Sequence, residues 1–184
     1  MVFSLPAPVL QMVLLAVVLL AGFYDVRSRR IPNWVSLSGI VLGIGLNSFL
    51  YGGAPGLTLA LKGLGLAFGV YLVLYALHAM GAGDVKLMAA VGSFVGWRDW
   101  LGIFLITALV GGILALMVVL MRKRFQKTVV NIGYILGEMA HARAAHLSRE
   151  ELDVRSPYSM GLPHGAVIAV GTVFFLATGA LLAH

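Results

Sequence analysis

Long runs of apolar residues alternate with short polar segments along the whole chain. The apolar runs cover about residues 8–24, 34–50, 57–80, 84–97, 100–121 and 161–183. A helix needs roughly 20 residues to cross the hydrocarbon core of a bilayer, and most of these runs approach or exceed that length. The run 84–97 is shorter, and it spans only if its helix begins at or before Asp84. The pattern predicts an all-α, polytopic integral membrane protein with about six transmembrane helices.

The composition supports a membrane protein rather than a soluble domain. Of the 184 residues, 60% are hydrophobic and only 11% are charged, and the mean hydropathy is +0.98. A soluble domain of this size needs more polar surface to cover its core. The chain has no cysteine, which excludes disulfides and thiolate metal sites. The net charge of +6 is explained by basic cytoplasmic loops, which membrane proteins commonly have, without a need for nucleic-acid binding. We therefore expect the lipid bilayer and no nucleic acid as a partner.

The distribution of basic residues predicts the orientation in the membrane. With six spans and the N-terminus outside, only Lys62 and Arg98 of the 13 lysines and arginines remain on the outer side. This bias is the one that the positive-inside rule describes. Without the short span 84–97, the basic segment 122–160 would lie on the opposite side from Arg27. The charges therefore favour six spans.

Segment 122–160 is the one sizeable polar stretch, and it is expected to form a cytoplasmic loop. One interpretation is a helix on the membrane surface, because Ile132, Ile135 and Met139 share one helical face. The alternative is a basic linker with one or two helical turns, and the sequence leaves both open. With no internal repeat, residues 1–184 are predicted to form a single membrane-embedded domain.

Two acids, Asp25 and Asp84, lie at predicted cytoplasmic ends of transmembrane helices. Each has a structural explanation. Asp84 would cap the fourth helix after Gly83 ends the third, and Asp25 would be an exposed carboxylate paired with Arg27 or Arg29. Taken together they favour a functional site, because ionisable groups at membrane depth are costly and tend to mark function.

A pair of carboxylates indicates a definite chemistry. At about 4 Å and an effective dielectric near 20 they repel by roughly 4 kcal/mol, so one of them holds a proton. The ionised group can then deprotonate a water while the neutral group donates to a carbonyl oxygen under attack. Lys86 and the Arg27–Arg30 cluster would oppose this proton sharing. Gly81 and Gly83 would loosen the helix and leave room for an extended peptide; a plain turn is the alternative.

Other catalytic and metal-binding arrangements are less well supported. The chain has neither cysteine nor a G-x-S-x-G sequence. His141 and His146 are five residues apart, which is off-register for zinc binding on one helical face. His78 is expected to be a packed interfacial histidine, and His164 to lie in a turn after Pro163. We expect no metal and no cofactor.

Three sequence elements resemble the type IV prepilin peptidase family of membrane aspartyl proteases. The family's G-x-G-D motif is matched by Gly81-Ala82-Gly83-Asp84, which continues as Val85-Lys86-Leu87. Asp25 is followed by Ile31-Pro32-Asn33, as in the family's other motif, and Pro157-Tyr158 through Gly161-Leu162-Pro163 is similar to its tail element. The resemblance covers roughly residues 10–183.

The resemblance implies a catalytic pair, Asp25 and Asp84. The residues of the same motifs that would shape the substrate approach are Gly81, Gly83, Lys86, Ile31, Pro32 and Asn33. The implied reaction removes the short basic leader of a prepilin or pseudopilin at the cytoplasmic face of the bacterial inner membrane. The oligomeric state stays open.

The chain also departs from the larger members of that family. They carry a methyltransferase region, often with a four-cysteine metal site, whereas here Asp25 comes early and cysteine is absent. The chain thus resembles the compact, peptidase-only form of tight-adherence or Flp-type pilus systems, and we expect no N-methyltransferase activity. The alternatives are a small transporter coupled to protons or cations and a non-catalytic membrane subunit of a secretion system.

Overall fold

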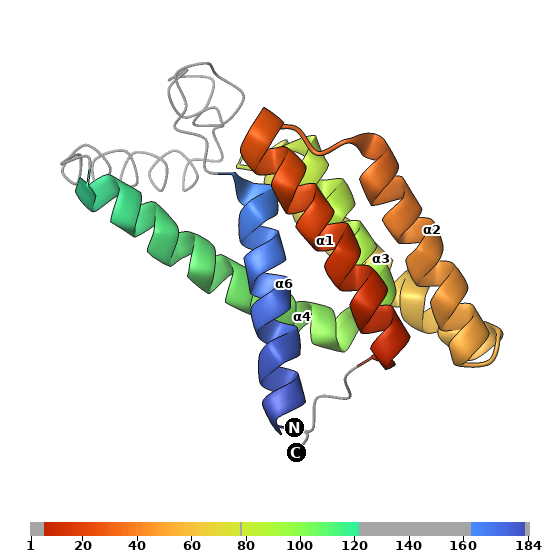
Figure 1. Cartoon of the computed structure of the whole chain (residues 1–184). Coiled ribbons are helices and arrows are strands. Elements are labelled where there is room, and N and C mark those ends of the chain that lie inside the picture. Colours follow the sequence, from red (N-terminus) through yellow and green to blue (C-terminus); the bar gives the residue numbers. More distant parts are fainter. Residues whose placement is uncertain (1–5, 78, 122–162, 183–184) are drawn as a thin grey trace, which may run out of the picture.

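The computed structural model describes residues 6–77, 79–121 and 163–182, and within these ranges it contains helices and no strand (Figure 1). His78, segment 122–160 and tail residues 157–162, on which sequence predictions fall, lie outside the described residues. The helices are α1 (Pro8–Ser28), α2 (Asn33–Leu50), α3 (Ala54–Ala76), α4 (Ala82–Met121) and α6 (His164–Leu182). All five are long and apolar enough to cross a membrane, which confirms the predicted all-α membrane fold.

Helix α4 is broken into two segments at Gly96. Its 40 residues would extend about 60 Å as a straight helix, roughly twice the thickness of the hydrocarbon core. Gly96 has φ 75° and ψ 177°, a conformation that only glycine adopts readily. The helix turns back there, as Figure 1 shows. Residues 82–95 and 97–121 thus correspond to the fourth and fifth predicted runs, and the described helices supply six segments in all.

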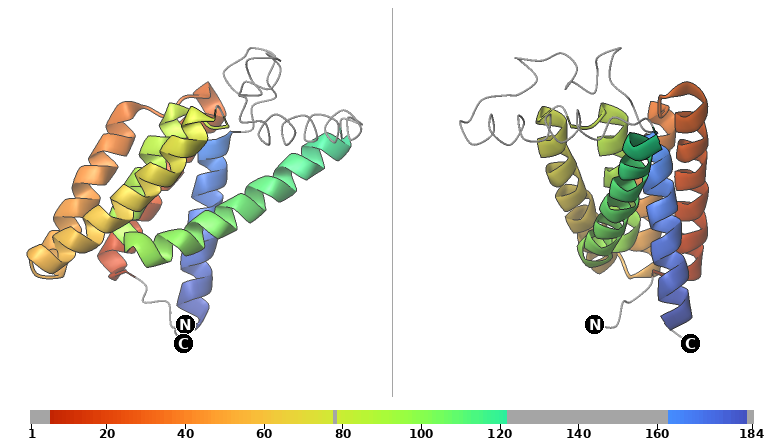
Figure 2. Two further views of the ribbon diagram at one scale, coloured as in Figure 1. Left: turned by 180° about the vertical axis from the view of Figure 1, so that it is seen from behind. Right: turned by 90° about the vertical axis from the view of Figure 1, so that its left-hand side faces the viewer.

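The ends of the helices lie at two opposite faces of the bundle. In Figure 1 the end of α1 and the starts of α2, α4 and α6 lie at the top, and the views in Figure 2 agree. The start of α1, the α2–α3 turn and the break in α4 lie at the bottom. Asp25, near the end of α1, and Asp84, near the start of α4, therefore lie at the same end of the molecule.

The boundary between α3 and α4 differs from the one predicted. Gly83 does not end the third helix, because α3 ends at Ala76 and Gly83 lies in the first turn of α4. The Asp84 carboxylate accepts a hydrogen bond from the Gly81 backbone N–H at 3.2 Å. This bond satisfies a donor that the helix itself leaves unpaired, and so favours a helix that begins before Asp84 rather than at it.

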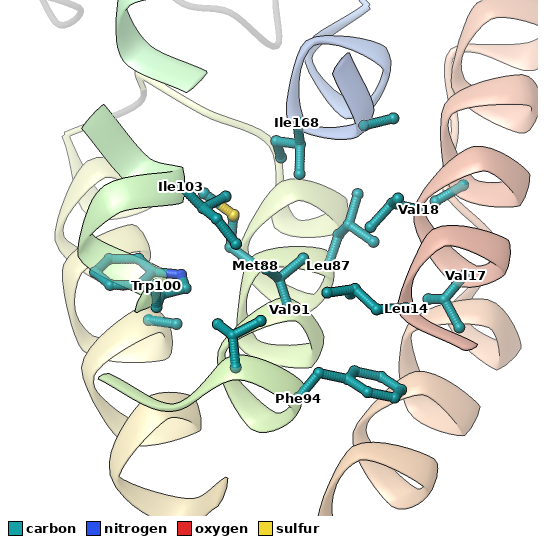
Figure 3. Packing of buried hydrophobic residues seen from close by; sticks show 14 of the residues in the cluster. Leu14, Val17, Val18, Leu87, Met88, Val91, Phe94, Trp100, Ile103 and Ile168 are labelled. Atoms are coloured by element: carbon teal, nitrogen blue, oxygen red, sulfur yellow. The ribbon is translucent and has the colours of Figure 1, made fainter. Parts of the chain in front are cut away.

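The first segment of α4 is the centre of the bundle. From Asp84 to Gly96 every residue except Lys86 is buried, and α4 packs against α1, α2, α3 and α6. Figure 3 shows side chains of this segment among residues of α1 and α6 and of the second α4 segment; those labelled include Leu87, Met88, Val91, Leu14, Val18, Trp100 and Ile168. A segment enclosed by protein has little contact with lipid, which explains why a run shorter than 20 residues suffices here.

Small and polar residues bring the neighbouring helices close to this central segment. A Cβ added at Gly43 of α2 would collide with Ser93, and one at Gly63 of α3 would collide with the backbone of Gly92. Such close contacts are typical of helix packing in membranes. The Asn47 side-chain amide donates to the carbonyl oxygens of Ser93 at 2.8 Å and Phe94 at 3.0 Å. These carbonyls lie at the end of the first segment, where helical partners run out.

Candidate active site

Asp25 lies one turn before the end of α1 and faces the start of α6. Its side chain is only 7% exposed, so the predicted alternative of an exposed carboxylate is wrong. Its Oδ2 accepts a hydrogen bond from the backbone N–H of Gly165 at 2.8 Å. Helices α1 and α6 pack closely beside it, since a Cβ at Gly22 would lie 3.2 Å from the Cβ of Ala169.

Asp84 is the third residue of α4 and is also buried, with 9% of its surface exposed. Its Oδ2 accepts a hydrogen bond from the backbone N–H of Gly81, the residue just before the helix. An acidic side chain at the third helical position makes the same bond in a capping box. Asp84 therefore has the predicted capping role, although it lies within the first turn of α4 and not at the position before the helix. This role does not exclude a chemical one, because a carboxylate has further acceptor positions.

The structure brings the two aspartates to one site at the meeting of three helices. Asp84 of α4 interacts electrostatically with Asp25 of α1 and with His164 at the start of α6. Because both carboxylates are buried, solvent screens their interaction far less than it would at the surface. The site therefore contains two carboxyl groups, and the charge of one affects the ionisation of the other.

Ile31 lies between the first turns of α4 and α6. A Cβ at Gly83 would lie 3.3 Å from the Cβ of Ile31, and one at Gly165 would lie 2.8 Å from its Cδ1. Pro32 precedes α2 in an extended conformation, which ends the connection from α1. Of the predicted motif residues, Ile31, Gly81 and Gly83 thus contact the site or its walls.

The other two predicted motif residues form a separate polar pair. The Nζ of Lys86 donates to Oδ1 of Asn33 at 2.9 Å, and this bond is exposed. It links the first turns of α2 and α4 on the outside of the site. Lys86 is the one exposed residue after Asp84 in the first α4 segment, so its cation remains accessible while its neighbours are buried.

Three residues near the aspartates were not predicted from the sequence. Gly165 binds Asp25, and His164 and Tyr71 each interact electrostatically with Asp84. Tyr71 is held in the core by edge-to-face contacts with the rings of Trp100 and Phe104. The sequence could have indicated His164, because a titratable residue at the start of a transmembrane helix is a candidate site residue. A tyrosine within an apolar run gives no comparable signal.

The arrangement is suited to proton transfer. In the part of the chain that the structure describes, no three histidine, aspartate or glutamate side chains gather as metal ligands would. The groups within electrostatic range of Asp84 are the Asp25 carboxyl group, the imidazole of His164 and the phenol of Tyr71. Paired carboxyl groups can act as acid and base on one substrate.

Fold and site together define a polytopic helical membrane protein with paired buried carboxylates at one end of its bundle. Residues 12–116, more than half of the chain, match the family model described as the type IV leader peptidase family, and the chain belongs to that family.

Two curated relatives carry the name prepilin leader peptidase/N-methyltransferase. They come from Aeromonas hydrophila and Aeromonas salmonicida (strain A449), and each is 31% identical to this chain over 121 residues. The match covers 60% of this chain and 40% of each relative, so the chain spans less than half of their length. No solved structure matches the chain.

Proposed function

We propose that the protein is a membrane aspartyl endopeptidase that removes the short basic leader of prepilins or pseudopilins. Family membership and the names of the Aeromonas relatives support the substrate class. The observation that carries the reaction is the burial of Asp25 and Asp84 within electrostatic range of one another at one end of an apolar bundle. Ionisable groups are costly at membrane depth and tend to mark function, so a buried pair of carboxyl groups supports a functional role.

In the proposed reaction one aspartate is ionised and the other is protonated. The ionised carboxylate takes a proton from water as the water oxygen attacks the carbonyl carbon of the scissile peptide bond. The protonated carboxyl group donates to the carbonyl oxygen, which gives a tetrahedral diol. The C–N bond then breaks as the leaving nitrogen receives a proton from the aspartate that accepted it from water. A diol hydroxyl returns its proton to the other aspartate as the carbonyl group re-forms, which restores the starting protonation of the pair. Water supplies both the hydroxyl and the proton, so no cofactor is needed.

The location of the pair suits a substrate that is itself anchored in the membrane. A prepilin carries its leader directly before an apolar segment, so its cleavage site lies at the edge of the bilayer. Asp25 and Asp84 lie at one end of the helical bundle. The basic residues Arg27, Arg29 and Arg30 follow Asp25 at that end, which by the positive-inside rule faces the cytoplasm of the inner membrane.

Incubation of the purified protein in detergent with a panel of type IV and Flp-type prepilins tests this proposal. We expect leader loss, detected as a fall in mass, for at least one precursor. Asp25→Asn and Asp84→Asn should each abolish cleavage, because an amide cannot exchange the titrating proton. The double variant should be no worse than either single variant, since the pair acts as a unit.

Two results would contradict the proposal. One is cleavage within a few-fold of wild type in either asparagine variant. The other is an uncut panel under conditions in which the Aeromonas hydrophila relative cuts its own precursor.

A further inference from the structure

The start of α6 is capped by a side chain from another helix. The first N–H groups of a helix have no partner within it, and a Ser, Thr, Asp or Asn just before the helix usually binds one of them. Here the preceding residue is Pro163, whose side chain has no acceptor. The Gly165 N–H instead donates to Oδ2 of Asp25, 140 positions away in sequence, at 2.8 Å. Asp25 thus has the bond that an N-cap residue would normally have.

The contact leaves no room for a side chain at position 165. A Cβ there would lie 3.1 Å from both the Cβ and Oδ2 of Asp25, and 2.8 Å from Cδ1 of Ile31. Real Cβ atoms essentially never lie within 3.0 Å of another heavy atom, so a Cβ here would force Ile31 or Asp25 to move. Glycine lets the backbone of α6 approach the carboxylate this closely without displacing Ile31 or Asp25.

The same turn of α6 also reaches the second aspartate. His164, directly before Gly165, interacts electrostatically with Asp84, while Gly165 binds Asp25. The first turn of α6 is therefore the part of the molecule that touches one aspartate and influences the other. A displacement of this turn would therefore change the position of Asp25 relative to Asp84.

We propose that Gly165 is a positioning residue for the reaction: its N–H group and its lack of a side chain together hold the Asp25 carboxylate opposite Asp84. The inference rests on the proposed function, because it assigns Gly165 a role through Asp25. Reacting groups must be held close to their productive geometry, and a displacement of about 1 Å can cost roughly 100-fold in rate. Gly165 fixes one oxygen of Asp25 and leaves its other oxygen for water.

The first test compares two glycine-to-alanine substitutions in the same α1–α6 interface. Gly165→Ala should lower kcat for prepilin cleavage at least tenfold and leave KM within about threefold, since binding of the precursor does not depend on Asp25 geometry. Gly22→Ala adds a Cβ that would lie 3.2 Å from Ala169, 3.4 Å from Ala166 and 3.7 Å from the carbonyl oxygen of Gly165, with neither carboxylate among its three nearest atoms. It should keep kcat within a few-fold of wild type.

A second variant separates crowding of Ile31 from displacement of Asp25. Ile31→Val removes Cδ1, the atom nearest to the added Cβ, and so relieves strain that could prevent Gly165→Ala from folding. The double variant should melt at nearly the temperature of Ile31→Val alone and still show a kcat at least tenfold below it. A double variant as active as Ile31→Val would overturn the inference, because Gly165 would then merely make room for Ile31.

Asp25→Asn in the same assay tells the two failures apart. If Asp25→Asn cleaves normally, the proposed function fails and the role of Gly165 fails with it. If Asp25→Asn is inactive while Gly165→Ala keeps kcat within threefold, the two-aspartate reaction stands and only the positioning role is rejected.

Discussion

At the scale of single residues, both aspartates use one oxygen to bind a backbone N–H near the start of a helix. Asp84 does so within its own helix, to Gly81, and Asp25 does so across the bundle, to Gly165. These bonds reduce the cost of burying a carboxyl group and hold each side chain in place. The structural role and the proposed chemical role therefore fall on the same side chains, and separate substitutions are needed to distinguish them.

Substitution of Asp84 by asparagine or by alanine makes this distinction. Asparagine can still accept the Gly81 N–H, so Asp84→Asn should melt near the wild-type temperature, whereas Asp84→Ala loses the bond and about 1 kcal/mol of stability. Both variants should lose cleavage. Thermal unfolding in detergent and a cleavage assay on the same preparations provide the two measurements. Activity that follows stability, with Asp84→Asn active and Asp84→Ala impaired, would show that Asp84 only caps the helix.

The sequence predicts these residues to different degrees. Asp25 and Asp84 are prominent because acids are rare in this chain and costly in a membrane. Gly165 gives no such signal, because its contribution is a backbone N–H that every residue except proline has. Its contact with Asp25 spans 140 positions and depends on how α1 packs against α6, which hydrophobic periodicity does not determine.

At the scale of elements, the apolar runs predict the helices and a turn after the run 84–97, but neither the position of that turn at Gly96 nor its conformation. Between Ala82 and Met121 the chain is apolar except for a few charged residues, with no proline to end the helix. The break falls at Gly96, one of several glycines in that stretch, and its φ of 75° is a property of the fold. Asn47 on α2 binds the carbonyls of Ser93 and Phe94 just before it, and this long-range contact was not predictable.

Two glycine substitutions within α4 test whether the break is required. Gly96→Ala should lower stability by about 1–3 kcal/mol, because φ 75° with ψ 177° is essentially a glycine conformation and the new Cβ would lie 3.1 Å from Leu59. Gly112→Ala is the control, since it lies within the second segment with nothing within 4 Å of the new Cβ. It should be neutral or stabilising by up to about 1 kcal/mol. Equal melting temperatures for the two variants would contradict a strained break at Gly96.

At the scale of the whole molecule, the bundle is built around the first α4 segment. Asp84 lies in the first turn of that segment, which is enclosed by the four other described helices, so the aspartate is attached to the most buried part of the protein. The second segment, residues 97–121, returns to the end of the bundle where the aspartates lie (Figure 2). The same end therefore carries the site and the end of α4, and the positive-inside rule predicts that it faces the cytoplasm.

Single cysteines introduced into this cysteine-free chain test that orientation. Ser28→Cys and Met121→Cys lie at exposed positions at the end of α1 and the end of α4, and Ala54→Cys lies exposed at the start of α3. By the positive-inside rule, a membrane-impermeant maleimide should label positions 28 and 121 only in inside-out vesicles and position 54 only in intact spheroplasts. Detergent-solubilised protein, in which all three should react, is the control for accessibility. Labelling of position 121 from the same side as position 54 would mean that α4 does not turn back at Gly96. Reversed labelling of all three would keep the fold but place the aspartate pair on the outer face, away from any cytoplasmic leader.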